Sequence, residues 1–176
     1  ISLTPFCSVS TAFNYFSKDF TAAATLTAQN QQLATTQNYA GVFAKLSSAG
    51  YSFKARDTVT STNLTSRMQT SSLSGTWSSG LLTSSASINL ARAAAPDGPY
   101  SATKVGLVVT DTDSVALRSS DLTFDSDGNG SNDALLYGQS AFYFGRLRLD
   151  DAFGPETANL AVSFQVDYWT GSIWSR

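Results

Sequence analysis

The stretch from Asp125 to Asp133 carries oxygen-bearing side chains at alternate positions, a pattern that can bind a hard cation. Calcium takes roughly six to eight oxygen ligands, and glycines between the donors let the backbone curl around the ion. The stretch therefore predicts calcium as a cofactor, with Asp111, Asp113 or Asp121 completing the coordination shell. The candidate ligands are Asp125, Asp127, Asn129, the Ser131 carbonyl and Asp133.

A polar surface turn is the alternative interpretation of this acidic stretch. Its match to an EF-hand loop is partial, because Leu136 stands where the bidentate Glu is expected. Asn-Gly and Asp-Gly pairs are also common in turns that bind no metal. If calcium does bind, the missing Glu predicts a weak site, with a Kd of about 0.1 to 1 mM.

A second group of carboxylates, Asp150, Asp151, Glu156 and Asp167, could supply the acid and base of a glycosidase. Nothing in the sequence raises a carboxyl pKa there or places two carboxylates about 5 Å apart. A solvated turn is therefore the favoured interpretation of these residues.

Arginines and aromatic residues near the C-terminus offer two further candidate contacts. Arg146 and Arg148 share one strand face, where pairing with neighbouring Asp residues is favoured over ligand binding. Tyr168, Trp169 and Trp174 could stack on sugars, but packing in the core or at a sheet edge is favoured.

Histidine is absent and Cys7 is the single cysteine, which excludes a Ser-His-Asp triad, a Cys-His pair and an ordinary zinc site within this sequence. Cys7 could be a buried apolar residue, a reactive thiol or half of a disulfide whose partner lies outside residues 1–176. The disulfide is favoured, because a lone exposed thiol is unusual in an oxidising compartment.

The elements that would position these residues have the two-residue period of β-strands. The clearest hairpin joins residues 140–149 to residues 160–169 through a turn at 150–156. Residues 104–110 form a nearly continuous apolar run, as expected of a central strand covered on both faces.

The remaining expected elements are short strands separated by polar turns. Residues 20–28 alternate as a half-buried strand, with a helix over 20–33 as the alternative, and residues 71–85 are expected to be a loop with a short strand near Trp77. The other predicted strands are 33–39, 42–46, 51–56, 59–64 and 86–95, the last ended by a turn at 96–99.

This spacing predicts an all-β fold, an antiparallel β-sandwich of the Ig-like or jelly-roll-like kind with little helix. A single unit over residues 1–176 is expected, and two small packed modules over 1–95 and 96–176 are the alternative. Because the sequence begins at Ile1 and not at Met, we expect a piece of a longer protein.

Composition narrows the class of partner. Ser and Thr fill 47 positions, charged residues are 14% and the net charge is -2, so hydroxyl groups provide much of the solubility, as in extracellular β-proteins. Twelve of the thirteen acids are Asp, which favours turns over helices. The sequence predicts no nucleic-acid binding, and no apolar run reaches the roughly 20 residues of a membrane span.

Four sequence blocks resemble the C-terminal region of MshQ-like proteins of the bacterial mannose-sensitive haemagglutinin (MSHA) pilus, a type IV pilus system. Residues 38–44 carry an Asn-Tyr-x-Gly-x-Phe-Ala block and residues 97–100 an Asp-Gly-Pro-Tyr turn. Residues 144–154 carry a Phe-Gly-Arg-Leu-Arg-Leu-x-x-Ala-x-Gly run, and residues 168–171 a Tyr-Trp-x-Gly ending.

The resemblance implies an exported cell-surface protein of a Gram-negative bacterium, from a family of undefined function. It transfers no catalytic residue, and it implies a cysteine beyond residue 176 that would pair with Cys7. We therefore expect a non-catalytic structural or adhesive module whose partners are pilus or cell-surface proteins, or glycans. A carbohydrate-active enzyme or glycan-binding domain that uses Asp carboxylates is the rival, and a deep pocket lined by two facing carboxylates would favour the enzyme.

Overall fold

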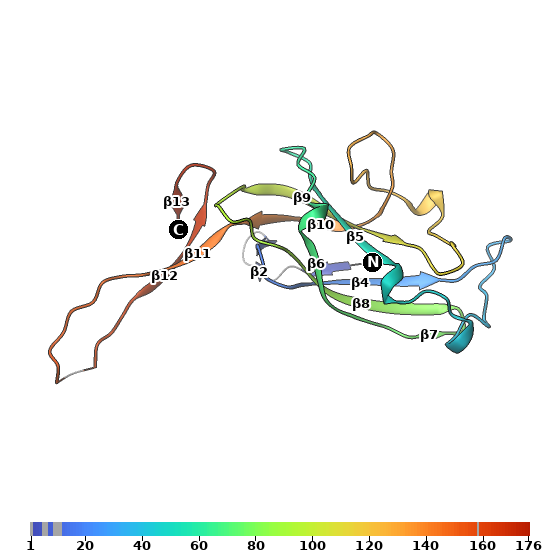
Figure 1. The fold of residues 1–176 in the computed structure, drawn as a ribbon, viewed down its shortest axis with the longest axis horizontal. Helices are drawn as coiled ribbons and strands as arrows, with labels where there is room; N and C mark the ends of the chain where they lie inside the picture. Colours follow the sequence, from blue (N-terminus) through green and yellow to red (C-terminus); the bar gives the residue numbers. More distant parts are fainter. Residues whose placement is uncertain (1, 5–6, 9–11, 158) are drawn as a thin grey trace.

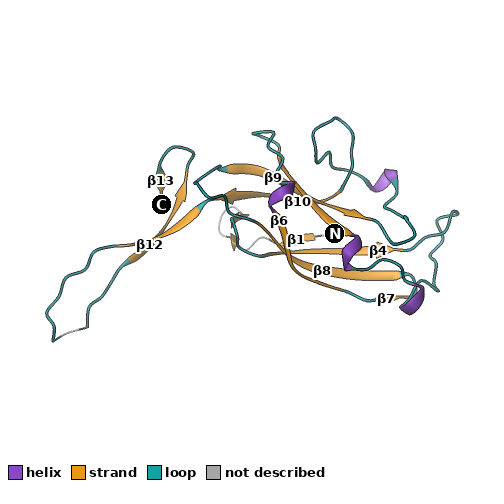
Figure 2. Ribbon diagram, viewed as in Figure 1, coloured by secondary structure: helices purple, strands orange, loops and turns teal. Residues whose placement is uncertain are grey.

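The computed structural model describes residues 2–4, 7–8, 12–157 and 159–176, and it confirms the predicted all-β, sandwich-like fold. Two five-stranded sheets face each other, and a three-stranded sheet projects from one end of the sandwich (Figure 1). Helix is limited to single 3-10 turns (Figure 2), so no described helix is long and apolar enough to cross a membrane. These turns are η1 (Gly41–Phe43), η2 (Ser48–Gly50), η3 (Thr65–Arg67) and η4 (Ser119–Asp121).

The first sheet has the order β1-β4-β8-β6, with the short β7 also paired to β8, and all its pairs are antiparallel. The long strands β4 and β8 run side by side over the whole length of β4, from Phe20 opposite Ile88 to Thr27 opposite Leu81. The strands are β1 (Ser2–Thr4), β4 (Phe20–Thr27), β6 (Met68–Ser74), β7 (Trp77–Ser78) and β8 (Leu81–Leu90).

The second sheet has the order β2-β3-β10-β9-β5, and only its β3–β10 pair is parallel. Strand β9 lies between β10 and β5, which confirms the predicted central strand. Because β5 pairs with β9 and β3 with β10, strands from both sides of residue 95 share this sheet. Its strands are β2 (Cys7–Ser8), β3 (Ala12–Tyr15), β5 (Tyr51–Asp57), β9 (Tyr100–Val109) and β10 (Leu135–Tyr143).

A single hydrophobic core fills the space between the two sheets. Strand β4 turns Phe20, Ala22, Ala24 and Leu26 inward and leaves alternate positions exposed, as a two-residue period requires. These side chains pack in one cluster with buried residues of β8, β5, β9 and β10. At about 25 cal/mol per Å² of apolar surface removed from water, this burial is the main source of stability.

The third sheet contains β11 (Gly145–Leu149), β12 (Phe164–Trp169) and β13 (Trp174–Ser175), in that order. Strands β11 and β12 form the predicted hairpin, with Leu147 opposite Val166, but β12 begins at Phe164, and residues 160–163, predicted to be strand, lie in the loop. The predicted 140–149 strand is divided at Phe144, because β10 pairs in the sandwich whereas β11 pairs with β12. The hairpin is joined by a long loop that extends away from the body (Figure 1).

Several strand predictions are wrong in the first half of the chain. Residues 33–46 form a loop that contains η1 instead of a return strand, because β1 and β8 already occupy both edges of β4. Residues 59–64 form a turn in which the Asp57 carboxylate accepts hydrogen bonds from the Val59 and Thr60 amides. The predicted strands at 20–28 and 51–56 are confirmed.

Residues 71–85, expected to be a loop, contain parts of β6 and β8 as well as the predicted short strand at Trp77. The inward face of β8 includes Ser84 and Ala86, both buried, so its apolar alternation is weak in the sequence. Small residues fit there because β4 brings Ala22 and Ala24 to the same part of the core. Strand β8 ends at Leu90, before the predicted end at residue 95.

Candidate functional site

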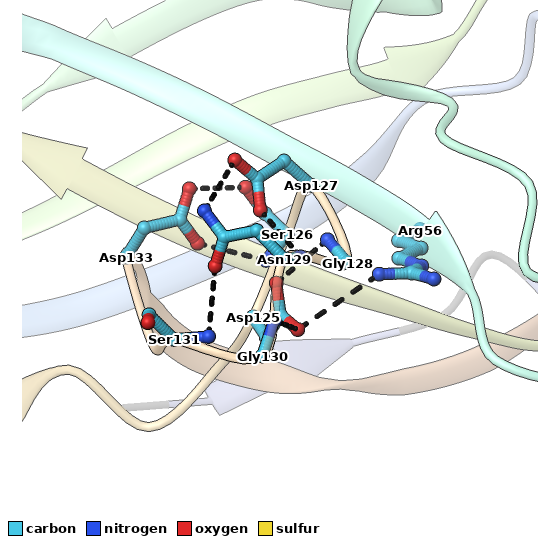
Figure 3. A network of polar contacts seen from close by, with 9 residues as sticks. All are labelled: Arg56, Asp125, Ser126, Asp127, Gly128, Asn129, Gly130, Ser131 and Asp133. Atoms are coloured by element: carbon cyan, nitrogen blue, oxygen red, sulfur yellow. Dashed lines mark hydrogen bonds and ion pairs between the residues drawn. The ribbon is translucent and has the colours of Figure 1, made fainter.

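The acidic loop, residues 125–133, is pinned at both ends by a two-residue bridge. Phe124 and Ala134 exchange backbone hydrogen bonds of 2.9 and 3.0 Å, and both side chains are buried. The loop is therefore a closed turn on the second sheet, leading directly into β10. All five predicted calcium ligands lie within it (Figure 3).

Asp125 organises the first half of the acidic loop. Its carboxylate accepts the Gly128 amide at 2.6 Å and the Gly130 amide at 2.9 Å. Both glycines have positive φ, +84° and +91°, which glycine tolerates best. The Gly130 hydrogen bond, the Gly128 hydrogen bond and the Arg56 charge, 4.0 Å away, hold the pKa of Asp125 below its ordinary value of 3.8.

The other two carboxylates of the loop are also engaged. Asp133 accepts the Ser126 amide and the Ser126 hydroxyl, both at 2.7 Å, and Ser126 is buried. Asp127 accepts the backbone and side-chain N–H groups of Asn129, both at 3.0 Å, while the side-chain oxygen of Asn129 accepts the Ser131 amide. The Asp133 carboxylate faces Ser126, and the Asp125 carboxylate is the one nearest Arg56 (Figure 3).

This arrangement stabilises a turn by itself, because each carboxylate replaces solvent with N–H or O–H donors of the loop. A calcium ion would have to compete with these donors for the same oxygens. Within the described ranges, no three acidic or cysteine side chains are grouped so that they could hold a metal. The calcium site stays a prediction, and binding would require the carboxylates to turn away from their present donors.

The three residues expected to complete the coordination shell lie elsewhere. Asp111, Asp113 and Asp121 line a cleft of about 1010 Å³, whereas Asp125 lines a separate hollow of about 270 Å³ with Arg56 and Lys104. Arg56 and Lys104 are directly opposite on β5 and β9, a repulsive pairing that the Asp125 carboxylate offsets.

The cleft lies at the end of the sandwich where β4 and β9 end and β10 begins. Its lining includes apolar side chains from both sheets, Leu26 of β4 and Val109 of β9 among them. Tyr39 and Trp77 also line it, with ring centroids 4.8 Å apart in an edge-to-face arrangement. An apolar floor with a few fixed polar groups is typical of ligand-binding clefts, and no pattern in the sequence predicted this one.

Tyr39 joins the two loops that border the cleft. Its hydroxyl accepts the Lys45 and Leu46 amides at 3.0 Å and donates to the Asp111 carboxylate at 3.1 Å. Asp111 in turn accepts the amides of Asp113 and Val115. Burial and the Asp111 carboxylate raise the pKa of the Tyr39 phenol, so it stays a hydrogen-bond donor.

A second link across the cleft runs through Arg118. Its guanidinium lies 3.4 Å from the Gln29 side-chain oxygen and forms an ion pair with Asp121 at 3.3 Å. The loops at 28–39 and 110–123 are therefore fixed to each other at two points. Such links pre-form a binding site, which lowers the entropy that a ligand must lose on binding.

The third sheet has one face on which charged groups pair with one another. Arg146 contacts the buried Asp167 at 3.1 Å, and Arg148 lies 3.7 Å from the same carboxylate. Arg148 also donates to Gln165, which donates to Asp150. The prediction that Arg146 and Arg148 pair with neighbouring Asp residues is confirmed, and Asp150 and Asp167 are structural members of this network.

The opposite side of β11 and β12, here named the apolar face, consists of Leu147, Leu149, Phe164 and Val166. Leu147 pairs with Val166 and Leu149 with Phe164 across the two strands. Their exposed fractions are 63%, 64%, 68% and 49% in residue order, and Phe153 in the adjoining loop is 94% exposed. Contiguous exposed apolar surfaces are typical of sites that contact other molecules.

Aromatic residues attach the third sheet to the sandwich. Tyr168 lies 5.1 Å from Tyr143 of β10, and Trp174 lies 5.5 Å from Trp169 and 6.1 Å from Phe144, ring centroid to ring centroid. Trp169 and Trp174 also pack against the main core. The predicted packing role of Tyr168, Trp169 and Trp174 is confirmed.

Cys7 has its backbone in β2, opposite Phe13. Its side chain falls outside the part of the chain that the structure describes. The disulfide to a cysteine outside residues 1–176 therefore stays a prediction.

Two family models match the chain. The model described as the third domain of DUF6701 matches residues 1–135, and the model of its fourth domain matches residues 143–176. Searches of curated proteins and of solved structures return no match. The second match begins at the end of β10 and takes in the whole third sheet.

Proposed function

The chain belongs to the DUF6701 family, and from this premise we propose that it is a non-catalytic structural or adhesive module of a larger cell-surface protein. The observation that carries the proposal is the apolar face of the third sheet. In an isolated soluble domain, the charged side of such a hairpin would face water and the apolar side would be covered. Here the Asp167 carboxylate is buried while Leu147, Leu149, Phe164 and Val166 are exposed.

This inverted arrangement favours contact with another polypeptide layer. Three short strands spanning 143–176 are too small to form a core of their own, since units below about 40 residues need additional support. The aromatic junction supplies support on one side only. A second polypeptide layer on the apolar face would supply the rest, as sheets do when they pack at about 10 Å.

The sequence blocks shared with MshQ-like proteins support a place in an MSHA-type pilus system. On this proposal the protein is exported to the surface of a Gram-negative bacterium, where its direct partners are pilus or other cell-surface proteins. The high Ser and Thr content and the low charge suit that location.

A glycan hydrolase remains the rival, because the cleft brings Asp111, Asp113 and Asp121 to one site. Two of these carboxylates are already engaged. Asp111 accepts three hydrogen bonds, and Asp121 is paired with Arg118. A general acid and a general base must each be free to exchange a proton with the substrate, which favours binding over hydrolysis.

The proposal is tested in the native bacterium by labelling intact cells with an antibody against the sandwich, and by measuring piliation and attachment after gene deletion. We expect surface labelling and a loss of attachment or piliation. A pull-down with purified pilus subunits then identifies direct partners. Protein found only inside intact cells, or release of sugar from polysaccharides by the purified protein, would refute the proposal.

A further inference from the structure

The cleft at the open end of the sandwich contains two kinds of surface that a single ligand could use together. Leu26, Val109 and Leu117 contribute apolar surface, and Tyr39 and Trp77 contribute an aromatic wall. The indole nitrogen of Trp77 is buried and has no hydrogen-bond acceptor among the described residues. A buried donor without an acceptor is unfavourable, because its lost hydrogen bonds to water are not replaced.

The polar rim of the cleft adds groups that are free to bind. Gln31 and Asp113 are exposed, and their side chains make none of the hydrogen bonds or ion pairs found in the described chain. Together they offer an amide donor, an amide acceptor and carboxylate acceptors. These groups suit a ligand that carries several hydroxyls, each of which can donate and accept.

Charge narrows the class of ligand. Asp111, Asp113 and Asp121 line the cleft, and Arg118 is paired with Asp121. This excess of carboxylates repels phosphate, sulfate and carboxylate groups. The volume, about 1010 Å³, is at the upper end of the range of small-molecule sites, so it can accept more than one sugar ring.

We propose that this cleft binds a short neutral oligosaccharide. The apolar C–H side of a sugar ring would pack against the aromatic wall, while its hydroxyls bind the Asp113 carboxylate and the Gln31 amide. Tyr39 and Arg118 act as positioning residues, because they hold the two bordering loops together. The inference rests on the adhesive role proposed above and gives it a site and a ligand class.

The test is ligand-observed NMR with purified protein and a panel of neutral trisaccharides of glucose, mannose and galactose at millimolar concentration. The panel also contains sialyllactose, a heparin-derived disaccharide and an uncharged octapeptide. We expect at least one neutral trisaccharide to bind, and the acidic sugars and the peptide not to bind. Binding by none of the neutral sugars, or binding by the acidic sugars or the peptide with equal strength, would overturn the proposal.

Three variants locate the site. Asp113→Ala with Gln31→Ala removes rim groups that have no structural partner, and should weaken trisaccharide binding about tenfold, the size expected for one lost charge-assisted hydrogen bond. Trp77→Leu removes aromatic surface from the wall on which the sugar ring packs, and should also weaken binding. Asp151→Ala, an exposed acid in the distant hairpin loop, should leave binding unchanged.

Equal affinity of the Asp113→Ala, Gln31→Ala double variant and the wild type would overturn the location. The two proposals fail separately. If no trisaccharide binds but surface labelling and attachment are observed, only the oligosaccharide proposal is refuted. If a trisaccharide binds but the protein is found only inside cells, only the surface role is refuted. Cleavage of the bound trisaccharide would replace both with the hydrolase alternative.

Discussion

At the scale of single residues, Asp125 shows how this chain uses its acids. Its short side chain reaches back to the amides of Gly128 and Gly130, and Asp57 and Asp111 bind nearby backbone in the same way. The excess of Asp over Glu could be interpreted from the sequence as a sign of such turns. The direction in which each carboxylate points could not be predicted from the sequence, because metal binding and turn formation use the same residues at the same spacing.

Calcium should stabilise the folded protein only slightly. Since the acidic loop carboxylates must leave their present donors, we expect the melting temperature to rise by a small amount in millimolar calcium relative to chelator. At ten times Kd the gain is about 1.4 kcal/mol in the free energy of unfolding. Asp127→Ala should abolish the rise, and identical wild-type melting temperatures with and without calcium would show that the loop is a polar turn.

The two glycines of the acidic loop give a matched pair of substitutions. A Cβ at Gly128 would collide with the Arg56 guanidinium, whereas one at Gly130 would meet open space, although both positions have positive φ. Gly130→Ala should cost about 1 kcal/mol of backbone strain, and Gly128→Ala about 1 to 2 kcal/mol, because the flexible Arg56 guanidinium would also have to move away from Asp125. Denaturant unfolding measures both, and equal costs would mean that Arg56 does not pack on the loop.

Asp125 should make stability depend on acid. The pKa of its carboxyl is lowered in the folded protein. Asp125 therefore contributes stability that is fully present above pH 3.8, the ordinary pKa, and is lost as the pH falls through the lowered pKa of the folded state. Asp125→Asn removes that contribution, so its free energy of unfolding should fall less steeply with acid than that of the wild type. Parallel curves for the two proteins over this acidic range would contradict the assignment.

At the scale of elements, strand prediction succeeded where apolar residues alternate with polar ones, as in β4, β5 and the β11–β12 hairpin. It missed the first half of β8, residues 81–85, where the buried Ser84 gives little contrast between the two faces. It also failed at 33–46, where local β-propensity was overruled by strands from distant parts of the chain. The cleft was missed for the same reason, since residues far apart in sequence form its lining.

The apolar face of β11 and β12 should tolerate polar substitution in the free protein. Leu147 and Val166 form an exposed cross-strand pair. Leu147→Thr and Val166→Thr, combined in a double variant, should therefore each change the free energy of unfolding by no more than about 0.5 kcal/mol. Ile88→Ala in the core of β8 should cost about 2 to 5 kcal/mol. A core-sized loss in the Leu147, Val166 double variant would show that the apolar face is covered within the chain itself.

At the scale of the whole molecule, the chain combines a sandwich that has its own core with a projecting sheet (Figure 1), one side of which is apolar and exposed. The β-sandwich class and the hairpin were predictable from periodicity and turn residues. The division at Phe144 was not, because the chain runs from β10 into β11 with almost no break in its strand pattern. Because of that division, the two proposed roles fall at opposite ends of the molecule. The cleft proposed to bind oligosaccharide is at the open end of the sandwich, and the apolar face proposed to contact another polypeptide is on the projecting sheet.

The central claim is that the apolar face contacts another polypeptide at the cell surface, and site-specific photo-crosslinking on intact cells tests it directly. A photoreactive residue at Leu149 should cross-link to a polypeptide segment, either of a separate protein or of the same protein outside residues 1–176. The control is Val59, which is 68% exposed but isolated in a turn of the sandwich, and it should give no comparable product. Absence of a polypeptide cross-link at Leu149, or the same pattern at Leu149 and Val59, would contradict the account.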